Sequence, residues 1–325
     1  MALTFGDLRT EALQWLDESN AATTSSSYLN VTAALKQAHT IRLTEDLWKF
    51  MLWPGDVTIT TIANQQLYSL HQEFLRPYLF RNTTRKTWLT ETPSRNIISD
   101  GIDFDRDQDA DRFSLWGRTP ITAQPSSASV ITISSSSAGD TTAAKAITIT
   151  GDTTSGVTTE DITPNGTTPV AGTTSFTTII EVTKAAAWTG TMTMTSNATA
   201  VTNLTLFPTE YGRSYPQMQL LYLPTAGESI KYRFYRKPRD LSAANDMTNI
   251  PPPFERVLVW DALLLMAAYD NRLDNGRKGL WMEYRDTLDM QMRQTYIEGQ
   301  SIGAEPRLIG YSGFGDAPRQ HTAVE

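Results

Sequence analysis

The hydrophobic pattern is strongest over residues 250–296, where it predicts two helices. The first follows the prolines at 251–253, and proline suits a first helical turn because its missing N–H would have no partner there. Apolar side chains occupy nearly every face of this helix as far as Tyr269, so we expect it to be covered on several sides. Asn275 and Gly276 predict its end, and a second helix is expected at 280–296.

Two more helices are predicted near the start of the chain. Thr4 followed by Asp7 has the spacing of a capping box, which predicts a helix running to about Glu18. Apolar residues recur at helical spacing over 31–52 and predict a second helix that ends at Trp53.

Alternating patterns between these helices predict two β-hairpins. The first joins 57–60 to 66–70, and the second joins 218–223 to 229–235. In the second hairpin, basic and aromatic residues alternate over 231–239, a composition that could grip nucleic acid. The pattern favours a half-buried strand instead, with one face formed by Lys231, Arg233 and Tyr235 and the other by Tyr232 and Phe234.

The composition changes over 121–206, where threonine dominates and charged residues are few. Short alternating segments separated by turn residues predict a compact β-sandwich, and a buriable Trp188 argues against a disordered linker. The expected fold class is therefore α+β. It has a discontinuous, mainly α-helical host domain with β-hairpins at 1–118 and 207–298, an inserted all-β sandwich at 119–206, and an extended C-terminal arm at 299–325.

Composition narrows the class of protein. The chain has 325 residues, enough for two domains, and no cysteine, which excludes disulfides and zinc–thiolate sites. Its first residues lack a signal-peptide pattern, and its longest apolar run falls short of a membrane span. A formal net charge of −7 argues against a protein that mainly grips nucleic acid phosphates. These features predict a soluble protein made in the cytoplasm.

No catalytic constellation emerges from the motifs. His39, His71 and His321 lack metal-ligand spacing, and no nucleophile elbow or phosphate-binding loop is present. Aspartates recur between Asp100 and Asp111 and could bind calcium, but glycine and glutamate are missing where an EF-hand requires them, so a solvated loop is favoured. We expect no enzyme, no cofactor and no metal.

The layout resembles the head-to-tail adaptor (connector) proteins of tailed bacteriophages. The resemblance is loose and covers most of 1–118 and 207–298. It rests on the first helix at 3–8, aromatic residues at 48–50, the segments 66–70 and 221–236, the proline-led helix from 250 to 263, and a last helix with Trp281 and Tyr284. The insertion is similar to Ig-like decoration modules of phage structural proteins, through the segments 147–151, 159–167 and 189–190.

The resemblance implies a structural virion protein at the head–tail junction. It implies a ring, usually a dodecamer, that docks on the portal protein, contacts tail or nozzle proteins and lets double-stranded DNA pass through its bore, with no membrane partner. The arm would bind the portal through Arg307, Tyr311, Phe314 and Arg319. Packing between subunits would involve the helical residues Trp260, Leu264, Tyr269, Trp281 and Tyr284.

Two other functions stay open at this stage. The chain could be a virion protein that binds a receptor or glycan through the Ig-like insert. A weaker alternative is a polysaccharide-degrading enzyme, because paired carboxylates for glycoside hydrolysis are a spatial feature that a sequence does not reveal.

Overall fold

A computed structural model describes residues 2–63, 65–93, 111–125, 127–196, 201–269 and 275–297. The chain divides into two compact units, Met1–Met51 with Pro238–Glu325, and Leu52–Lys237. The predicted host segments 1–118 and 207–298 each contribute to both units. The structure is mostly β, with 36% strand and 27% helix, so the prediction of a mainly α-helical host is wrong.

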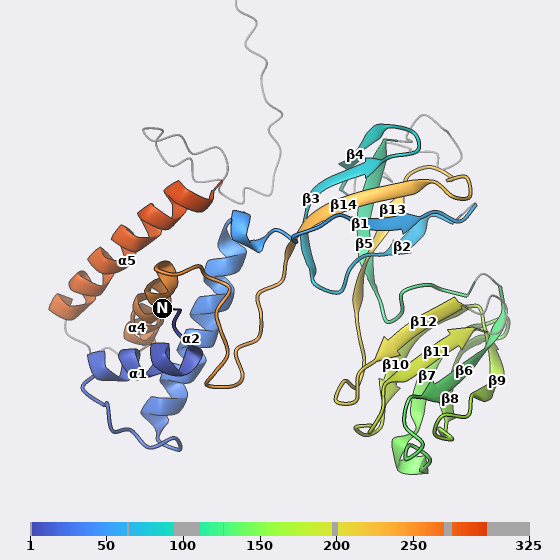
Figure 1. Cartoon of the computed structure of the whole chain (residues 1–325), viewed down its shortest axis with the longest axis horizontal. Helices are drawn as coiled ribbons and strands as arrows, with labels where there is room; N and C mark the ends of the chain where they lie inside the picture. The colour runs from blue at the N-terminus through green and yellow to red at the C-terminus, as the bar shows by residue number, and fades with distance from the viewer. Residues whose placement is uncertain are drawn as a thin grey trace, which may run out of the picture. The chain divides into compact units, whose positions relative to one another are not determined.

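The first unit is a group of four helices in which α4 is central (Figure 1). α4 contacts the other three, which explains why it is apolar nearly all round. A single 3-10 turn at Phe254–Arg256 precedes it. The helices are α1 (Phe5–Trp15), α2 (Ser26–Glu45), α4 (Val257–Tyr269) and α5 (Asn275–Tyr296).

Helix ends follow local chemistry, with two differences from prediction. The capping box is confirmed, because the Thr4 Oγ1 accepts from the Asp7 backbone N–H and Asp7 accepts from the Thr4 backbone N–H. α2 ends at Glu45, earlier than predicted, and Trp48 folds back so that its Nε1 donates to the Arg42 carbonyl at 2.7 Å. Asn275 and Gly276 open α5 instead of ending α4.

The second unit contains a seven-stranded sheet that curls into a nearly closed barrel. Its strand order is β1-β14-β3-β4-β5-β13-β2, and all neighbours are antiparallel except β4 and β5. The strands are β1 (Val57–Thr60), β2 (Leu67–Ser69), β3 (Phe74–Asn82), β4 (Thr87–Glu91), β5 (Arg112–Thr119), β13 (Tyr215–Leu220) and β14 (Ser229–Arg236).

Both predicted hairpins are wrong, although their strands exist. β1 pairs with β14 and β2 pairs with β13, so the strands of the first predicted hairpin lie at opposite edges of the sheet. β13 and β14 likewise pair with other strands and not with each other. The turn residues between two consecutive strands therefore show that the chain reverses direction there. They do not show that the two strands pair with each other, because the curled sheet brings other strands between them.

Aromatic rings fill the inside of this sheet. Phe80 stacks on Phe113 at 4.4 Å and on Tyr232 at 4.9 Å between ring centroids. Tyr232 and Phe234 are buried, and Lys231 and Arg233 are exposed, as the alternation predicts. Tyr235 is buried as well, where it bridges to Leu52 and meets the Tyr78 ring at 5.8 Å between centroids.

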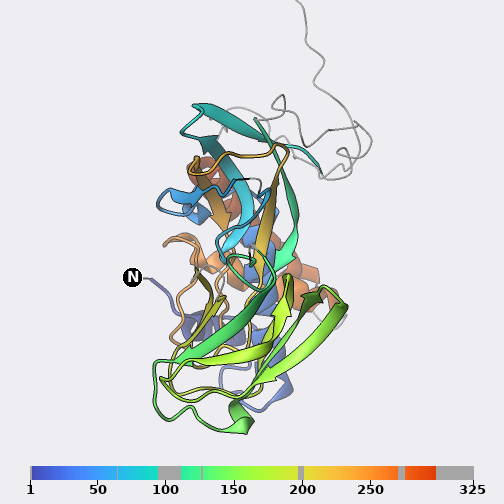
Figure 2. The ribbon, with the colours of Figure 1, turned by 90° about the vertical axis from the view of Figure 1, so that its right-hand side faces the viewer.

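The segment between β5 and β13 forms two further sheets, drawn in green and yellow in Figures 1 and 2. Their orders are β10-β7-β8 and β12-β11-β6-β9. Inward residues from both sheets build one buried core that includes Ile131, Ile149, Phe176 and Trp188, which makes the segment a β-sandwich. The strands are β6 (Ser129–Ser135), β7 (Ile147–Thr153), β8 (Gly156–Ile162), β9 (Val170–Phe176), β10 (Thr178–Lys184), β11 (Met192–Ser196) and β12 (Val201–Leu206).

Candidate functional site

Three aromatic rings from three helices meet on the surface of the helical unit. Trp260 of α4 meets Trp15 of α1 edge-on, with 5.0 Å between ring centroids, and stacks on Tyr284 of α5 at 5.1 Å. Trp260 is buried, but Trp15 and Tyr284 are 37% and 44% exposed. We call Trp15, Trp260 and Tyr284 the aromatic cluster. It forms an aromatic surface fixed from beneath by a buried ring.

Neighbouring residues extend this surface and fix its edges. Leu280, one helical turn before Tyr284, is 39% exposed and continues the apolar strip along α5. Arg277 at the start of α5 donates to the Asp17 carboxylate at 3.0 Å, just beyond the end of α1. This exposed ion pair joins the ends of the two helices that carry the outer rings.

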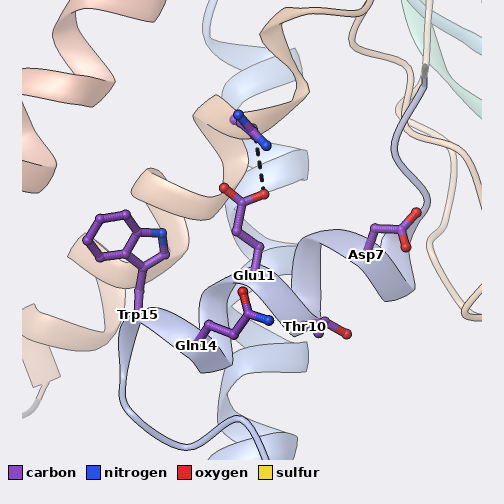
Figure 3. A pocket seen from close by; sticks show the side chains of 6 residues that line it. Asp7, Thr10, Glu11, Gln14 and Trp15 are labelled. Atoms are coloured by element: carbon purple, nitrogen blue, oxygen red, sulfur yellow. Dashed lines mark ion pairs between the residues drawn. The ribbon is translucent and has the colours of Figure 1, made fainter.

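A shallow hollow of about 500 Å³ lies beside Trp15 along α1. In Figure 3, Asp7, Thr10, Glu11, Gln14 and Trp15 line it from successive turns of the helix. The Glu11 carboxylate pairs with Arg256 at 3.3 Å. Hydrogen bonds from the backbone and hydroxyl of Thr4 lower the pKa of Asp7.

The lining of this hollow holds carboxylates, an amide, a hydroxyl and a guanidinium, but no histidine. Glu11 pairs with Arg256, and the Asp7 carboxylate accepts from the Thr4 backbone N–H and hydroxyl in the cap. A polar hollow next to exposed rings has the composition of a protein-contact surface, with an aromatic anchor and a polar rim.

An ion cluster around the buried Arg42 joins helices of the same unit. Arg42 of α2 donates to both carboxylate oxygens of Asp261 at 2.9 and 2.8 Å, and to Asp289 of α5 at 2.6 Å. Arg293 adds a bond to Asp289 at 2.7 Å. Burial raises the pKa of Asp261, and the Arg42 charge opposes that rise. The cluster links α2, α4 and α5 and is structural.

The residues predicted to pack between subunits have different environments. Trp260 and Tyr284 come together in the aromatic cluster, whereas Trp281 is fully buried within its own chain. Leu264 is half-buried beside the Arg42 cluster. The Tyr269 side chain lies outside the described residues. The predicted arm residues Arg307, Tyr311, Phe314 and Arg319 also lie outside the described residues.

Two parts of the site were missed by the sequence patterns. Trp15 lies at helical spacing with the apolar residues Leu8 and Ala12 of the first helix, and nothing in a single helix shows that its ring ends up half-exposed. The pairing of Arg42 with Asp261 was not predicted either. The available signal was Asp261 itself, because a lone carboxylate inside an apolar helical run requires a buried partner.

The other residues considered for chemistry in the sequence, the histidines and the aspartate series, have structural roles where the structure describes them. His39 is buried, and burial lowers its pKa to about 4. His71 packs against Trp53 at 4.4 Å between ring centroids. Asp111 is the only described member of the aspartate series, whose other members, like His321, fall outside the described ranges. Over those ranges no group of His, Asp or Glu side chains has the arrangement of a metal site.

The helices of the described segments include none that is long and apolar enough to cross a lipid bilayer. Comparison of the chain with models of known protein families and with curated protein sequences gives no match.

Proposed function

We propose that this chain is a structural virion protein, a head-to-tail adaptor of a tailed bacteriophage, whose helical unit packs against neighbouring copies of the chain. The observation that carries the proposal is the aromatic cluster, in which the outer rings of Trp15 and Tyr284 are 37% and 44% exposed over a buried Trp260. Large aromatic anchors of this kind dominate the energetics of protein interfaces.

The environment of the cluster supports a contact between proteins. The outer rings lose little conformational freedom on binding, because Trp260 already holds them in place. Apolar surface continues along α5 through Leu280, and the hollow on α1 supplies a polar rim. The Arg42 cluster ties α4 and α5, which carry Trp260 and Tyr284, to α2, so this part of the surface is preorganised.

The resemblance gives this contact its specific form. In the proposal, the helical unit joins copies into a ring, expected to hold twelve, at the head–tail junction of the virion. The portal and the tail or nozzle proteins are its partners, and double-stranded DNA passes through the bore. A net charge of −7 supports passage of DNA without adhesion. In the proposal, the contacts between copies lie on the smaller, helical part of the chain.

The aromatic cluster predicts the behaviour of a double variant, Trp15→Ala with Tyr284→Ala. Each truncation removes an anchor worth about 2 kcal/mol at an interface, so each is expected to weaken association about 30-fold. Sedimentation analysis over a wide concentration range should show wild-type assemblies many times the 36.2 kDa chain mass and a variant that remains monomeric.

Trp88→Ala is the matched control, because Trp88 is 58% exposed on β4 of the other unit. Its self-association should equal that of the wild type, and circular dichroism should show all variants folded. A wild-type chain that stays monomeric both alone and with purified portal contradicts the ring. Equal association of the double variant and the wild type contradicts the role of the aromatic cluster.

A further inference from the structure

A shallow polar cavity of about 520 Å³ lies in the second unit. Residues from β5, from β10, from the segment before β13 and from the end of β14 line it. The polar side chains relevant here are Gln72, Arg118, Thr119, Thr183, Ser214 and Lys237. Its volume is within the range of pockets that bind small molecules.

Two cations in this cavity lack a carboxylate partner among the described residues. The Arg118 guanidinium donates only to Ser214, from Nε to Oγ at 2.6 Å and from Nη2 to the carbonyl at 3.0 Å. The Lys237 ammonium donates to the Gln72 carbonyl at 2.8 Å. Both side chains therefore keep donors free, and Nη1 of Arg118 makes no contact with the described part of the chain.

The two cations line the same cavity, and the charge of one acts on the other. Burial lowers the pKa of Lys237, and the Arg118 charge lowers it further, with Glu73 opposing. Glu73 forms no ion pair with either cation within the described residues, and Arg118 is exposed, so solvent only partly screens the two positive charges from each other. A bound anion would relieve this repulsion.

The remaining charges of the lining do not remove the need for an anion. Arg213 is already neutralised by Glu210, which accepts from its Nε and Nη2 at 3.0 and 2.7 Å. Glu181 on β10 is the one carboxylate among the described lining residues; like Arg118 it is exposed, and it forms no ion pair with either cation in the described part of the chain. Arg118 and Lys237 thus face the cavity with a net positive charge.

We propose that this cavity binds a small molecule through an oxoanion group, a phosphate or a carboxylate. A planar guanidinium beside an ammonium matches such a group, because the guanidinium donates from two nitrogens and the ammonium adds a point charge. The hydroxyls of Thr183 and Ser214 line the same cavity and can bond to the rest of the molecule. Anion binding at this site does not depend on the proposed assembly of the chain into an oligomeric ring.

The test is calorimetric titration of the full chain with inorganic phosphate and with glucuronate, in a chloride buffer of fixed ionic strength. Glucose serves as the neutral control for glucuronate. We expect at least one of the two anions to bind and glucose not to bind. Tighter phosphate binding identifies a phosphate ligand, and tighter glucuronate binding identifies an acidic sugar. No binding of either anion at tens of millimolar overturns the proposal.

Variants locate the site. Arg118→Gln and Lys237→Gln should each weaken anion binding by about tenfold or more, the loss expected for one charge-assisted hydrogen bond. Lys231→Gln removes the same charge from the exposed face of β14, outside the cavity, and should leave binding unchanged. Equal weakening by all three overturns the site, because it indicates attraction by overall charge alone. The Lys237 variant keeps the Arg118–Ser214 bonds, so it stays informative if the Arg118 variant unfolds.

Discussion

Replacing Glu228 with alanine is expected to lower the free energy of unfolding of the seven-stranded sheet by about 3–5 kcal/mol, the cost of breaking a buried ion pair from one side. The carboxylate is only 2% exposed and accepts from Arg85 at 2.9 and 3.0 Å. It also accepts from Asn82 at 2.6 Å, from the Tyr222 hydroxyl at 3.0 Å and from Thr225 at 2.7 Å. Without the Glu228 carboxylate, the half-buried Arg85 guanidinium and the buried Asn82 and Tyr222 side chains lose a hydrogen-bond acceptor. Urea denaturation, followed by fluorescence of the unit's aromatic residues, measures the loss.

Asp56→Ala is the matched control, because it removes a carboxylate of the same unit from an ion pair whose two side chains, Arg233 and Asp56, are 49% and 42% exposed. Its expected cost is about 1 kcal/mol or less. Similar losses in the two alanine variants would show that the network around Glu228 contributes no more than a surface pair.

The Glu228 carboxylate also makes the free energy of unfolding depend on pH over a defined range. Burial alone would raise the pKa of Glu228, but hydrogen bonds from Arg85, Thr225 and Asn82 outweigh burial and lower it to about 2, from 4.5. The stabilisation is therefore fully present above about pH 4.5 and is lost as the pH falls toward 2. Glu228→Gln should lack this part of the acid dependence. Parallel stability curves for wild type and Glu228→Gln between pH 5 and 2.5 would contradict the assignment.

The second large effect is expected in the helical unit, for Arg42→Met. This change leaves the buried Asp261 carboxylate without its bidentate partner and should destabilise the unit by about 3–5 kcal/mol. Thermal unfolding followed by circular dichroism at 222 nm, where helices dominate the signal, measures it.

A double variant separates a lost ion pair from an unfilled space. Arg42→Met combined with Asp261→Leu removes both charges and replaces them with apolar groups, a change that is often neutral or stabilising. It should recover most of the stability that Arg42→Met loses. Arg277→Met is the control for charge alone, since the Arg277–Asp17 pair is exposed and is expected to contribute about 1 kcal/mol or less. A double variant as unstable as the single one would show that Arg42 acts by packing.

Local signals in the sequence predicted elements well and their partners poorly. The Thr4–Asp7 cap and the alternation of Tyr232 and Phe234 with Lys231 are short-range features, and the structure has them as predicted. Strand pairing depends on residues far apart, so the same signals gave two hairpins that do not form. The strands of both predicted hairpins belong to one seven-stranded sheet. Counting them as two small hairpins made the host domain look mainly helical.

In the candidate site, too, local features were predicted and long-range contacts were not. Trp260 and Tyr284 were singled out because they lie on strongly patterned helices. Trp15 joins them only through the packing of α1 on α4, which no periodicity within α1 encodes. The Arg42–Asp261 pair spans 219 positions, and a single sequence contains no measure of that separation. The Arg118–Lys237 pair was likewise invisible, because its cavity forms only when separate strands come together.

The placement of β1 at an open edge of the sheet also determines when the sheet can be completed. The Glu228 N–H donates to Thr61 across 167 positions, and β1 pairs with β14, which ends at Arg236. On a nascent chain the sandwich strands are all synthesised by residue 206, before either β13 or β14 exists. At ribosomal rates of 5–20 residues per second, the last strand of the sheet emerges about 2–6 s after the last strand of the sandwich. The middle of this chain can therefore fold first, and the sheet that flanks it in sequence has a high contact order and closes after the sandwich.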